Sequence, residues 1–283
     1  MKILYVTDLH GDYKKYKKVL DIAKNDHYDV VVNGGDMLPK CAGDMHKIQS
    51  NFLSWLATSH FPKYKENKIF YLGMLGNDDL MVFDSDFCSL EGRNQYFKDL
   101  SQSKVTVGGI DFIGCNYVTD YPFRLKDRCL RDTKESPMCP QYGGGLYSEV
   151  DGSFYNIEDW PEAIKKIPTL KQKLDSLPVS ASDKVIYVIH NPPTGCGLDV
   201  LRDGSSVGSK SVSDFIMRKQ PLYSLHGHVH ESPDVSGKFY AYLDNTVSIQ
   251  PGQLGLSHLS YVRIDIGREN HKEHKFDAYV VPV

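Results

Sequence analysis

Two pairs of residues that commonly bind metal ions stand at the ends of short apolar runs. Asp8 and His10 are two positions apart, and His228 and His230 repeat this spacing much later in the chain. In an extended segment, side chains two positions apart leave the backbone on the same side, so both members of a pair can reach one ion. Carboxylate oxygen combined with imidazole nitrogen suits Zn, Fe, Mn or Ni better than Ca. A single Asp-x-His pair also occurs by chance, so the other segments must decide its meaning.

Three more apolar runs end in turns that carry a possible ligand, namely Asp36 after residues 30–33, Asn77 after residues 69–72 and His190 after residues 185–189. In the N-terminal part, strands and helices alternate at short intervals, which predicts a parallel sheet with right-handed crossovers. Ligands collect beyond the carboxyl ends of the strands in such sheets. Taken singly, these residues are ordinary helix caps, turn formers or loop histidines. Taken together, the ordered set favours one metal site.

Seven ligands suit two divalent ions rather than one. A carboxylate such as Asp36 can bridge two ions, and ions about 3.5–4 Å apart stabilise the attacking and leaving oxygens of an in-line displacement. Two ions can also lower the pKa of a shared water and provide a hydroxide nucleophile at neutral pH. The sequence therefore predicts hydrolytic chemistry at a dinuclear centre.

The composition is that of a globular protein, and it limits the partners. The 283 residues are 41% apolar and 24% charged with a net charge of −3, which implies no general attraction to nucleic acid or anionic membranes. The apolar runs are only strand-sized, so we expect no transmembrane helix. A cleaved signal peptide would remove Asp8, so we expect a cytoplasmic protein whose six scattered cysteines are reduced.

The remaining pattern predicts a single domain over residues 1–283. One amphipathic helix begins near Asp12, a second covers residues 44–59, and Gly108-Gly109 marks a β-hairpin. Regular structure thins out over residues 117–182, which we interpret as a cap-like insertion that walls the active-site cleft. The C-terminal part alternates as antiparallel strands that form a second sheet face.

Five motifs occur in a fixed order over residues 8–230, namely Asp8-Leu9-His10, Gly35-Asp36, Gly76-Asn77-Asp78-Asp79, His190 and Gly227-His228-Val229-His230. Together they resemble the calcineurin-like metallophosphoesterase superfamily, whose pattern is D-x-H, G-D, G-N-H-[D/E], a histidine and G-H-x-H. The resemblance implies an α/β fold, a four-layer α/β/β/α sandwich. It also implies two divalent ions (Mn, Fe, Zn, Ni or Mg), one held by Asp8, His10, Asp36 and His230 and the other by Asp36, Asn77, His190 and His228.

The chain departs from the family pattern at Asp78, where the family has a histidine that is thought to orient the phosphate and protonate the leaving oxygen. An aspartate is an anion at pH 7 and repels a phosphate unless its surroundings neutralise it. We therefore expect a weaker enzyme, a substrate with a good leaving group, or an acid from elsewhere, such as His226 or a residue of the loop over 117–157. Asp78 is a candidate catalytic residue, and the alternative is a supporting or merely tolerated residue. The basic residues that could contact a phosphate, or could simply be surface charges, are Lys40, Arg124, Arg128 and Arg131.

The expected function is a dinuclear phosphoesterase in which a metal-bridging hydroxide attacks phosphorus in line. A phosphodiester or nucleotide-type small molecule is the preferred substrate, because the histidine is missing and Gly35-Asp36 lacks the Asp-Arg-Gly continuation of the protein serine/threonine phosphatases. The alternatives are a small-molecule phosphomonoesterase and a metal-binding scaffold with little catalysis because of Asp78. A nucleic-acid polymer is disfavoured by the net charge. The oligomeric state is left open.

Overall fold

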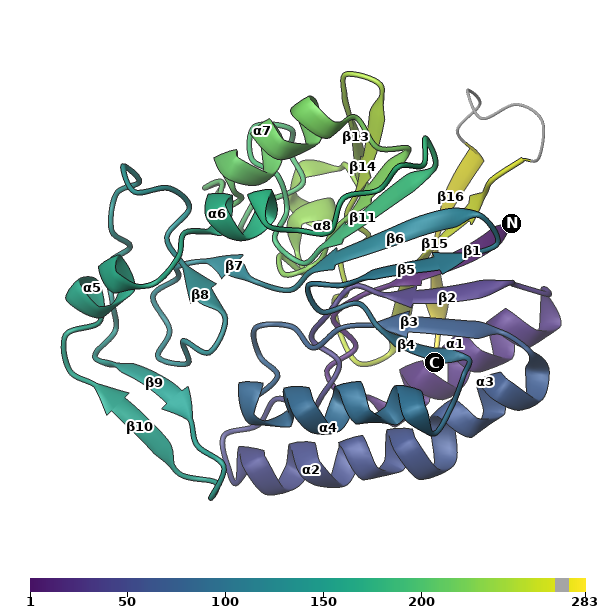
Figure 1. The fold of residues 1–283 in the computed structure, drawn as a ribbon, viewed down its shortest axis with the longest axis horizontal. Coiled ribbons are helices and arrows are strands. Elements are labelled where there is room, and N and C mark those ends of the chain that lie inside the picture. The colour runs from purple at the N-terminus through teal and green to yellow at the C-terminus, as the bar shows by residue number, and fades with distance from the viewer. Residues whose placement is uncertain (268–274) are drawn as a thin grey trace.

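Two six-stranded β-sheets pack face to face at the centre of the computed structural model, which describes residues 1–267 and 275–283 (Figure 1). The strand order of the first sheet is β16 (Lys275–Pro282), β15 (His258–Asp265), β1 (Lys2–Val6), β2 (Val30–Asn33), β3 (Phe70–Gly73) and β4 (Phe97–Asp99). Strands β1 to β4 are parallel, as the alternation of strands and helices predicts, whereas β15 and β16 are antiparallel to their neighbours.

The strand order of the second sheet is β13 (Tyr240–Leu243), β14 (Thr246–Ile249), β12 (Tyr223–Leu225), β11 (Val185–Ile189), β6 (Ile110–Cys115) and β5 (Lys104–Val107). The four inner strands are parallel, and an antiparallel strand lies at each edge. The hairpin between β5 and β6 turns through Gly108 and Gly109, both of which have positive φ. The predicted hairpin is therefore confirmed.

The apolar strands are buried on both faces, which explains why they read as continuous apolar runs. Along β1, Leu4 and Val6 pack in the cluster beneath the helices, whereas Ile3 and Tyr5 pack in the cluster between the two sheets. Side chains of Phe112 and other residues of the second sheet complete this central cluster. Alternate side chains of one strand thus serve two different layers.

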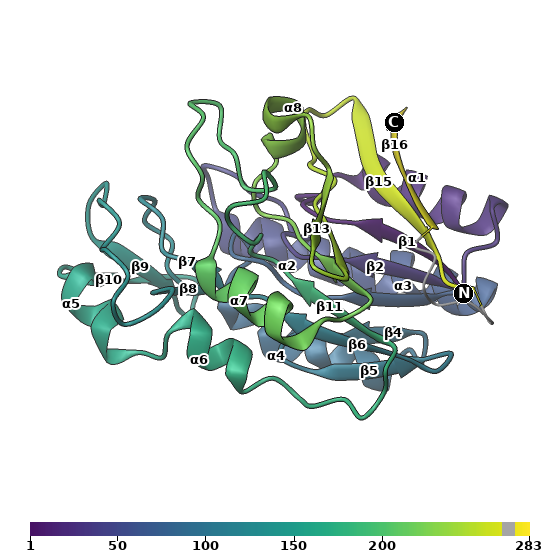
Figure 2. The same ribbon diagram turned by 90° about the horizontal axis from the view of Figure 1, so that it is seen from above.

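Helices cover the outer face of each sheet, which gives the four layers that the resemblance implies (Figure 2). Over the first sheet lie α1 (Tyr13–Asn25), α2 (Met45–Trp55), a π-helical turn (Leu56–His60), α3 (Phe61–Asn67), the 3₁₀ turn Met81–Phe83, α4 (Asp84–Ser89) and the 3₁₀ turn Leu90–Gly92. Over the second sheet lie α6 (Leu170–Asp175) and α7 (Lys210–Lys219), and α8 (Ser232–Ser236) follows β12. The Asp12 side chain caps the first helix, as predicted. The second predicted helix is longer than expected, since the π-helical turn and α3 continue it to residue 67.

Residues 117–182 contain more regular structure than the sequence indicates. The elements are the short strands β7 (Val118–Thr119), β8 (Cys129–Leu130), β9 (Gly145–Ser148) and β10 (Phe154–Ile157), then α5 (Trp160–Ala163), the 3₁₀ turn Ile164–Lys166 and α6. Most of this segment extends to one side of the two sheets (Figure 1). It has a small apolar cluster of its own around Trp160, which is fully buried.

The C-terminal antiparallel strands do not form a separate sheet face. Strands β13 and β14 extend the second sheet, and β15 and β16 extend the first. We propose that residues 1–283 form one domain. Strand β15, near the C-terminal end of the sequence, pairs with β1 near its N-terminal end. Residues 268–274, which belong to the predicted alternation, lie outside the described residues. Within the described part of the chain, none of the helices has the length and apolar character needed to cross a membrane.

Candidate metal centre and its cavity

Four of the predicted ligands form one compact cluster at the carboxyl ends of the strands. Asp8, His10, Asp36 and His230 each present a ligand atom, and these atoms all lie within 4.8 Å of one another. The His10 and His230 Nε2 atoms are 3.1 Å apart, and His230 Nε2 is 3.3 Å from the Asp8 carboxylate. Donors about 2.0–2.2 Å from a shared ion are separated by roughly 3–4 Å. The donor set and its spacing therefore fit one divalent ion.

The other three predicted ligands lie beside this cluster and share Asp36 with it. The Asn77 Oδ1 atom is 3.0 Å from His190 Nε2 and 2.7 Å from His228 Nδ1. The His190 Nε2 atom is also 3.5 Å from the Asp36 carboxylate. Asp36 therefore lies between the two groups, where a bridging carboxylate has to lie.

The backbone that carries these side chains is strained. Asp8, His10, Asp36 and His228 have φ angles of 55°, 44°, 50° and 71°, in the left-handed region that few residues other than glycine adopt. Each such residue costs of order 1–3 kcal/mol, so the surrounding structure must hold it in place. Part of that support comes from hydrogen bonds between two ligand-bearing loops, because Asp8 N donates to Gly35 O and His10 N donates to Asp36 O.

Glycines allow the loops to approach the ligands closely. A side chain on Gly76 would overlap the backbone nitrogen and the carboxylate of Asp36. A Cβ atom on Gly227 would lie 2.7 Å from the Asp8 carboxylate. The glycine that precedes Asn77 and the one that precedes His228 are therefore required by space at this site.

Asp79 and Arg128 hold the turn that carries Asn77. The buried Asp79 carboxylate accepts hydrogen bonds from the backbone N–H groups of Gly76, Met37 and Leu38, at 2.7–2.8 Å. The guanidinium group of Arg128, which is 1% exposed, donates to the carbonyl oxygens of Gly76 and Asp79. Arg128 is thus neither a phosphate ligand nor a surface charge. It is a buried residue of the insertion that stabilises this turn.

The buried carboxylates create a strongly negative potential at the centre. Burial alone lowers the pKa of His190, but the Asp36 and Asp8 carboxylates outweigh this effect and raise it to about 9. The same carboxylates affect His228 less, and burial together with His190 lowers its pKa to about 3. A cluster that holds a proton on a buried imidazole also attracts a cation. This potential agrees with the fit of the donor set to divalent ions.

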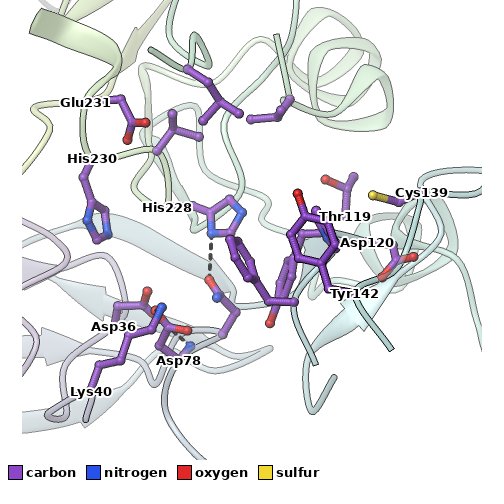
Figure 3. Close-up of a pocket in the computed structure, with 17 residues that line it drawn as sticks. Asp36, Lys40, Asp78, Thr119, Asp120, Cys139, Tyr142, His228, His230 and Glu231 are labelled. Carbon is purple, nitrogen blue, oxygen red and sulfur yellow. Dashed lines mark hydrogen bonds and ion pairs between the residues drawn. The ribbon is translucent and has the colours of Figure 1, made fainter. Parts of the chain in front are cut away.

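A cavity of about 470 Å³ opens over the centre. The candidate ligands Asp36, Asn77, His228 and His230 contribute to its wall. The other lining residues come from the loop after β2, the insertion and the loops after β11 and β12, and they are Lys40, Asp78, Thr119, Asp120, Tyr121, Pro122, Phe123, Cys139, Tyr142, Leu201, Val207, Val229 and Glu231. In Figure 3, Lys40 and Asp78 lie across the cavity from Tyr142. Several of these residues, among them Thr119 and Tyr142, belong to the insertion.

Lys40 compensates the negative charge of Asp78. Its Nζ atom is 2.7 Å from Asp78 Oδ2, and its side chain is 59% exposed, so its remaining N–H groups are free to contact a ligand in the cavity. Burial and the Asp36 carboxylate raise the pKa of Asp78, whereas Lys40 opposes this shift. The Asp78 carboxylate conversely raises the pKa of Lys40, although burial acts against it. The ammonium group is therefore retained beside the centre.

Other sequence candidates lie away from the cavity. His226 is fully buried, and its ring nitrogens contact Ile189 O and Ser224 Oγ, so it is not the missing acid. Arg124 and Arg131 bond to groups within the insertion and do not line the cavity. The aromatic and apolar residues of the cavity wall were not singled out from the sequence, where the only signal was the abundance of tyrosines in the insertion.

Comparison with known proteins identifies the family. The model of the calcineurin-like phosphoesterase family matches residues 1–232 of the sequence. The chain belongs to this family. The recognition of the family from its motifs is thereby confirmed, and so is the predicted fold class. The family uses divalent metals, which agrees with the candidate metal-binding cluster. No curated relative matches the chain.

Solved structures show the same fold at low sequence identity. One crystal structure aligns over 98% of the present chain and 98% of its own chain, with a TM-score of 0.61 and 16% identity. The protein TT1561 of Thermus thermophilus aligns over 98% and 97%, with a TM-score of 0.56 and 15% identity. A dimetal phosphatase from Danio rerio aligns over 93% of the present chain and 92% of its own chain, with a TM-score of 0.49 and 12% identity.

Substitution of Arg128 tests whether the insertion stabilises the metal centre. Arg128→Met leaves two buried carbonyl oxygens without their charged donor, so we expect the free energy of unfolding to fall by about 3 kcal/mol. Metal affinity should fall at least about tenfold, because the turn that carries Asn77 loses its support. Urea denaturation and metal titration check these effects against Arg93→Met, which removes an exposed arginine. Equal stability and metal affinity in the two variants would contradict the assigned role.

Proposed function

We propose that this chain is a dinuclear metal-dependent phosphoesterase that hydrolyses small phosphodiester or nucleotide-type substrates. The observation that carries the proposal is the arrangement of the seven family ligands in two adjoining groups that share Asp36. We assign one ion to Asp8, His10, Asp36 and His230, and the second to Asp36, Asn77, His190 and His228. A phosphorylated small molecule is the expected partner, while a nucleic-acid polymer is disfavoured by the net charge of −3. The cytoplasmic location stays a prediction.

The protein's own contribution is to hold these donors in place before the substrate arrives. When bound, divalent ions supply a water of lowered pKa and neutralise the charge that develops on the phosphoryl oxygens. The strained loops, the Asp79 hydrogen bonds and the Arg128 contacts fix the donors, so little reorganisation accompanies the reaction. Residues of the insertion form one side of the cavity wall.

We assign to Lys40 a role in binding the substrate phosphate. Its ammonium group is exposed to the cavity and forms an ion pair with Asp78. Asp78 occupies the sequence position where the family has a histidine. In this interpretation Asp78 is a positioning residue, and Lys40 donates to a phosphate oxygen. The net charge of the pair is zero, so the repulsion expected from an isolated Asp78 is absent. A directly catalytic Asp78 is the competing prediction.

The proposed activity is tested with a chromogenic phosphodiester and the matching phosphomonoester, each in the presence of Mn²⁺ or a chelator. We expect diester turnover that needs metal and falls at least about 10³-fold in Asp36→Asn, because this carboxylate serves both ions. The matched control Asp21→Asn changes an exposed aspartate of α1 and should retain activity. Unchanged turnover in Asp36→Asn would contradict the proposed mechanism. Faster turnover of the monoester than of the diester would favour the phosphomonoesterase alternative.

The roles of Lys40 and Asp78 are separated by a charge-balanced pair of variants. Lys40→Met leaves the Asp78 carboxylate unpaired beside the substrate phosphate, so we expect kcat/KM to fall roughly tenfold. Adding Asp78→Asn removes the repulsion and should recover most of this loss, whereas Lys14→Met on the exposed face of α1 should have no effect. A double variant that is less active than Lys40→Met alone would show that the Asp78 carboxylate itself acts in the reaction.

A further inference from the structure

A series of aromatic rings runs from the candidate metal centre along the insertion side of the cavity. The ring centroids of His228 and Tyr121 are 6.0 Å apart, those of Tyr121 and Phe123 are 6.0 Å apart, and those of Phe123 and Tyr142 are 5.9 Å apart. Tyr121, Phe123 and Tyr142 all line the cavity. Spacings of this size are typical of aromatic groups in contact. The rings therefore form one continuous wall that begins at a metal ligand.

The two outer rings are not part of the apolar core. Phe123 is 62% exposed and Tyr142 is 70% exposed, although both residues lie on the cavity. Their rings meet edge to face, with an angle of 78° between the ring planes. The described residues therefore leave large aromatic surfaces open to a ligand that enters the cavity.

The segments that carry these rings are held by a buried polar network. The Asp120 carboxylate, whose side chain is 7% exposed, is 2.9 Å from Lys126 Nζ and accepts a hydrogen bond of 3.0 Å from Trp160 Nε1. Its second oxygen accepts a hydrogen bond from Gln141. The backbone N–H of Tyr142 also donates to Pro122 O at 2.9 Å. The network fixes both segments, so the aromatic wall is formed before a ligand binds.

The cavity is larger than a phosphate group requires. Its volume of about 470 Å³ falls within the range of roughly 300–1,000 Å³ that is typical of sites for small organic ligands. Apolar side chains of Leu201 and Val207 also line it, and Thr119 and Glu231 add polar groups. A site with an anion-binding end, exposed aromatic rings and a few polar groups fits a planar heteroaromatic group attached to a phosphate.

We propose that Phe123 and Tyr142 form a subsite that stacks against the nucleobase of a nucleotide whose phosphate lies at the metal centre. This proposal rests on the proposed function for the position of the phosphate, and it adds the residues that select the organic part of the substrate. Stacking of a base on an aromatic side chain tightens binding by roughly 5- to 150-fold. The subsite therefore determines specificity, and the metal centre performs the chemistry.

Binding of two phosphonates that differ only in the base tests the subsite without turnover. The ligands are the methylenephosphonate analogues of adenosine 5′-monophosphate and of ribose 5-phosphate, in which a CH₂ group replaces the ester oxygen. Isothermal titration calorimetry of the Mn²⁺-loaded protein should give at least about tenfold tighter binding of the adenosine analogue. The double variant Phe123→Ala/Tyr142→Ala should lower this ratio to within about twofold and leave the affinity for the ribose analogue unchanged.

Tyr155→Ala is the matched control, since Tyr155 is a similarly exposed aromatic residue of β10 that does not line the cavity. A ratio near one in the wild type, or a ratio that survives in the double variant, would overturn the proposal. Equal weakening of both ligands would also overturn it, because the rings would then act on the phosphate end. A protein that prefers the adenosine analogue but hydrolyses no phosphate ester would retain the subsite and refute the proposed function.

Discussion

The burial of two carboxylates beside each other is the constraint on which the rest of this structure depends. Asp8 and Asp36 are each 1% exposed, and their mutual repulsion in a buried setting is costly unless cations lie between them. Histidines surround them, and the carboxylates outweigh the effect of burial, raising the pKa of His190 to about 9 and the pKa of His230 above its usual value. Divalent ions would balance the negative charge of the carboxylates. A site with this charge distribution favours the binding of cations, which agrees with the proposed metal centre.

Holding the carboxylates together requires loops from two sheets to meet at one edge. Residues after β1, β2 and β3 of the first sheet face residues after β11 and β12 of the second, and left-handed backbone at four ligands brings the side chains inward. The core between the sheets fixes the relative positions of these strands, so it also fixes the donors. The insertion adds a third support, because the Thr119 backbone N–H donates to the side-chain oxygen of Asn191, next to His190, at 2.9 Å. Packing and hydrogen bonds away from the centre thus preserve the geometry of its donor atoms.

The sequence was sufficient to predict the fold class and to select candidate ligands, four of which the fold brings together, but it was not sufficient to predict the cavity wall. Asp8, Asp36 and Asn77 could be predicted because each follows an apolar run whose buried strand sets its position. Burial on both faces does not reveal which sheet a strand joins, so the places of β13 to β16 could not be predicted. The burial of Arg128 and His226 depends on tertiary contacts with residues distant in sequence. The aromatic wall was missed for the same reason, because its rings come from two segments of an irregular region.

The proposed sharing of Asp36 by two ions can be tested directly by anomalous diffraction. Crystals of the wild-type protein grown with MnCl₂, measured at the manganese absorption edge, report the number and position of bound ions. We expect two anomalous peaks about 3.5–4 Å apart, one beside His10 and His230 and the other beside Asn77 and His190, with Asp36 between them. A single peak, or two peaks that do not both contact Asp36, would contradict it.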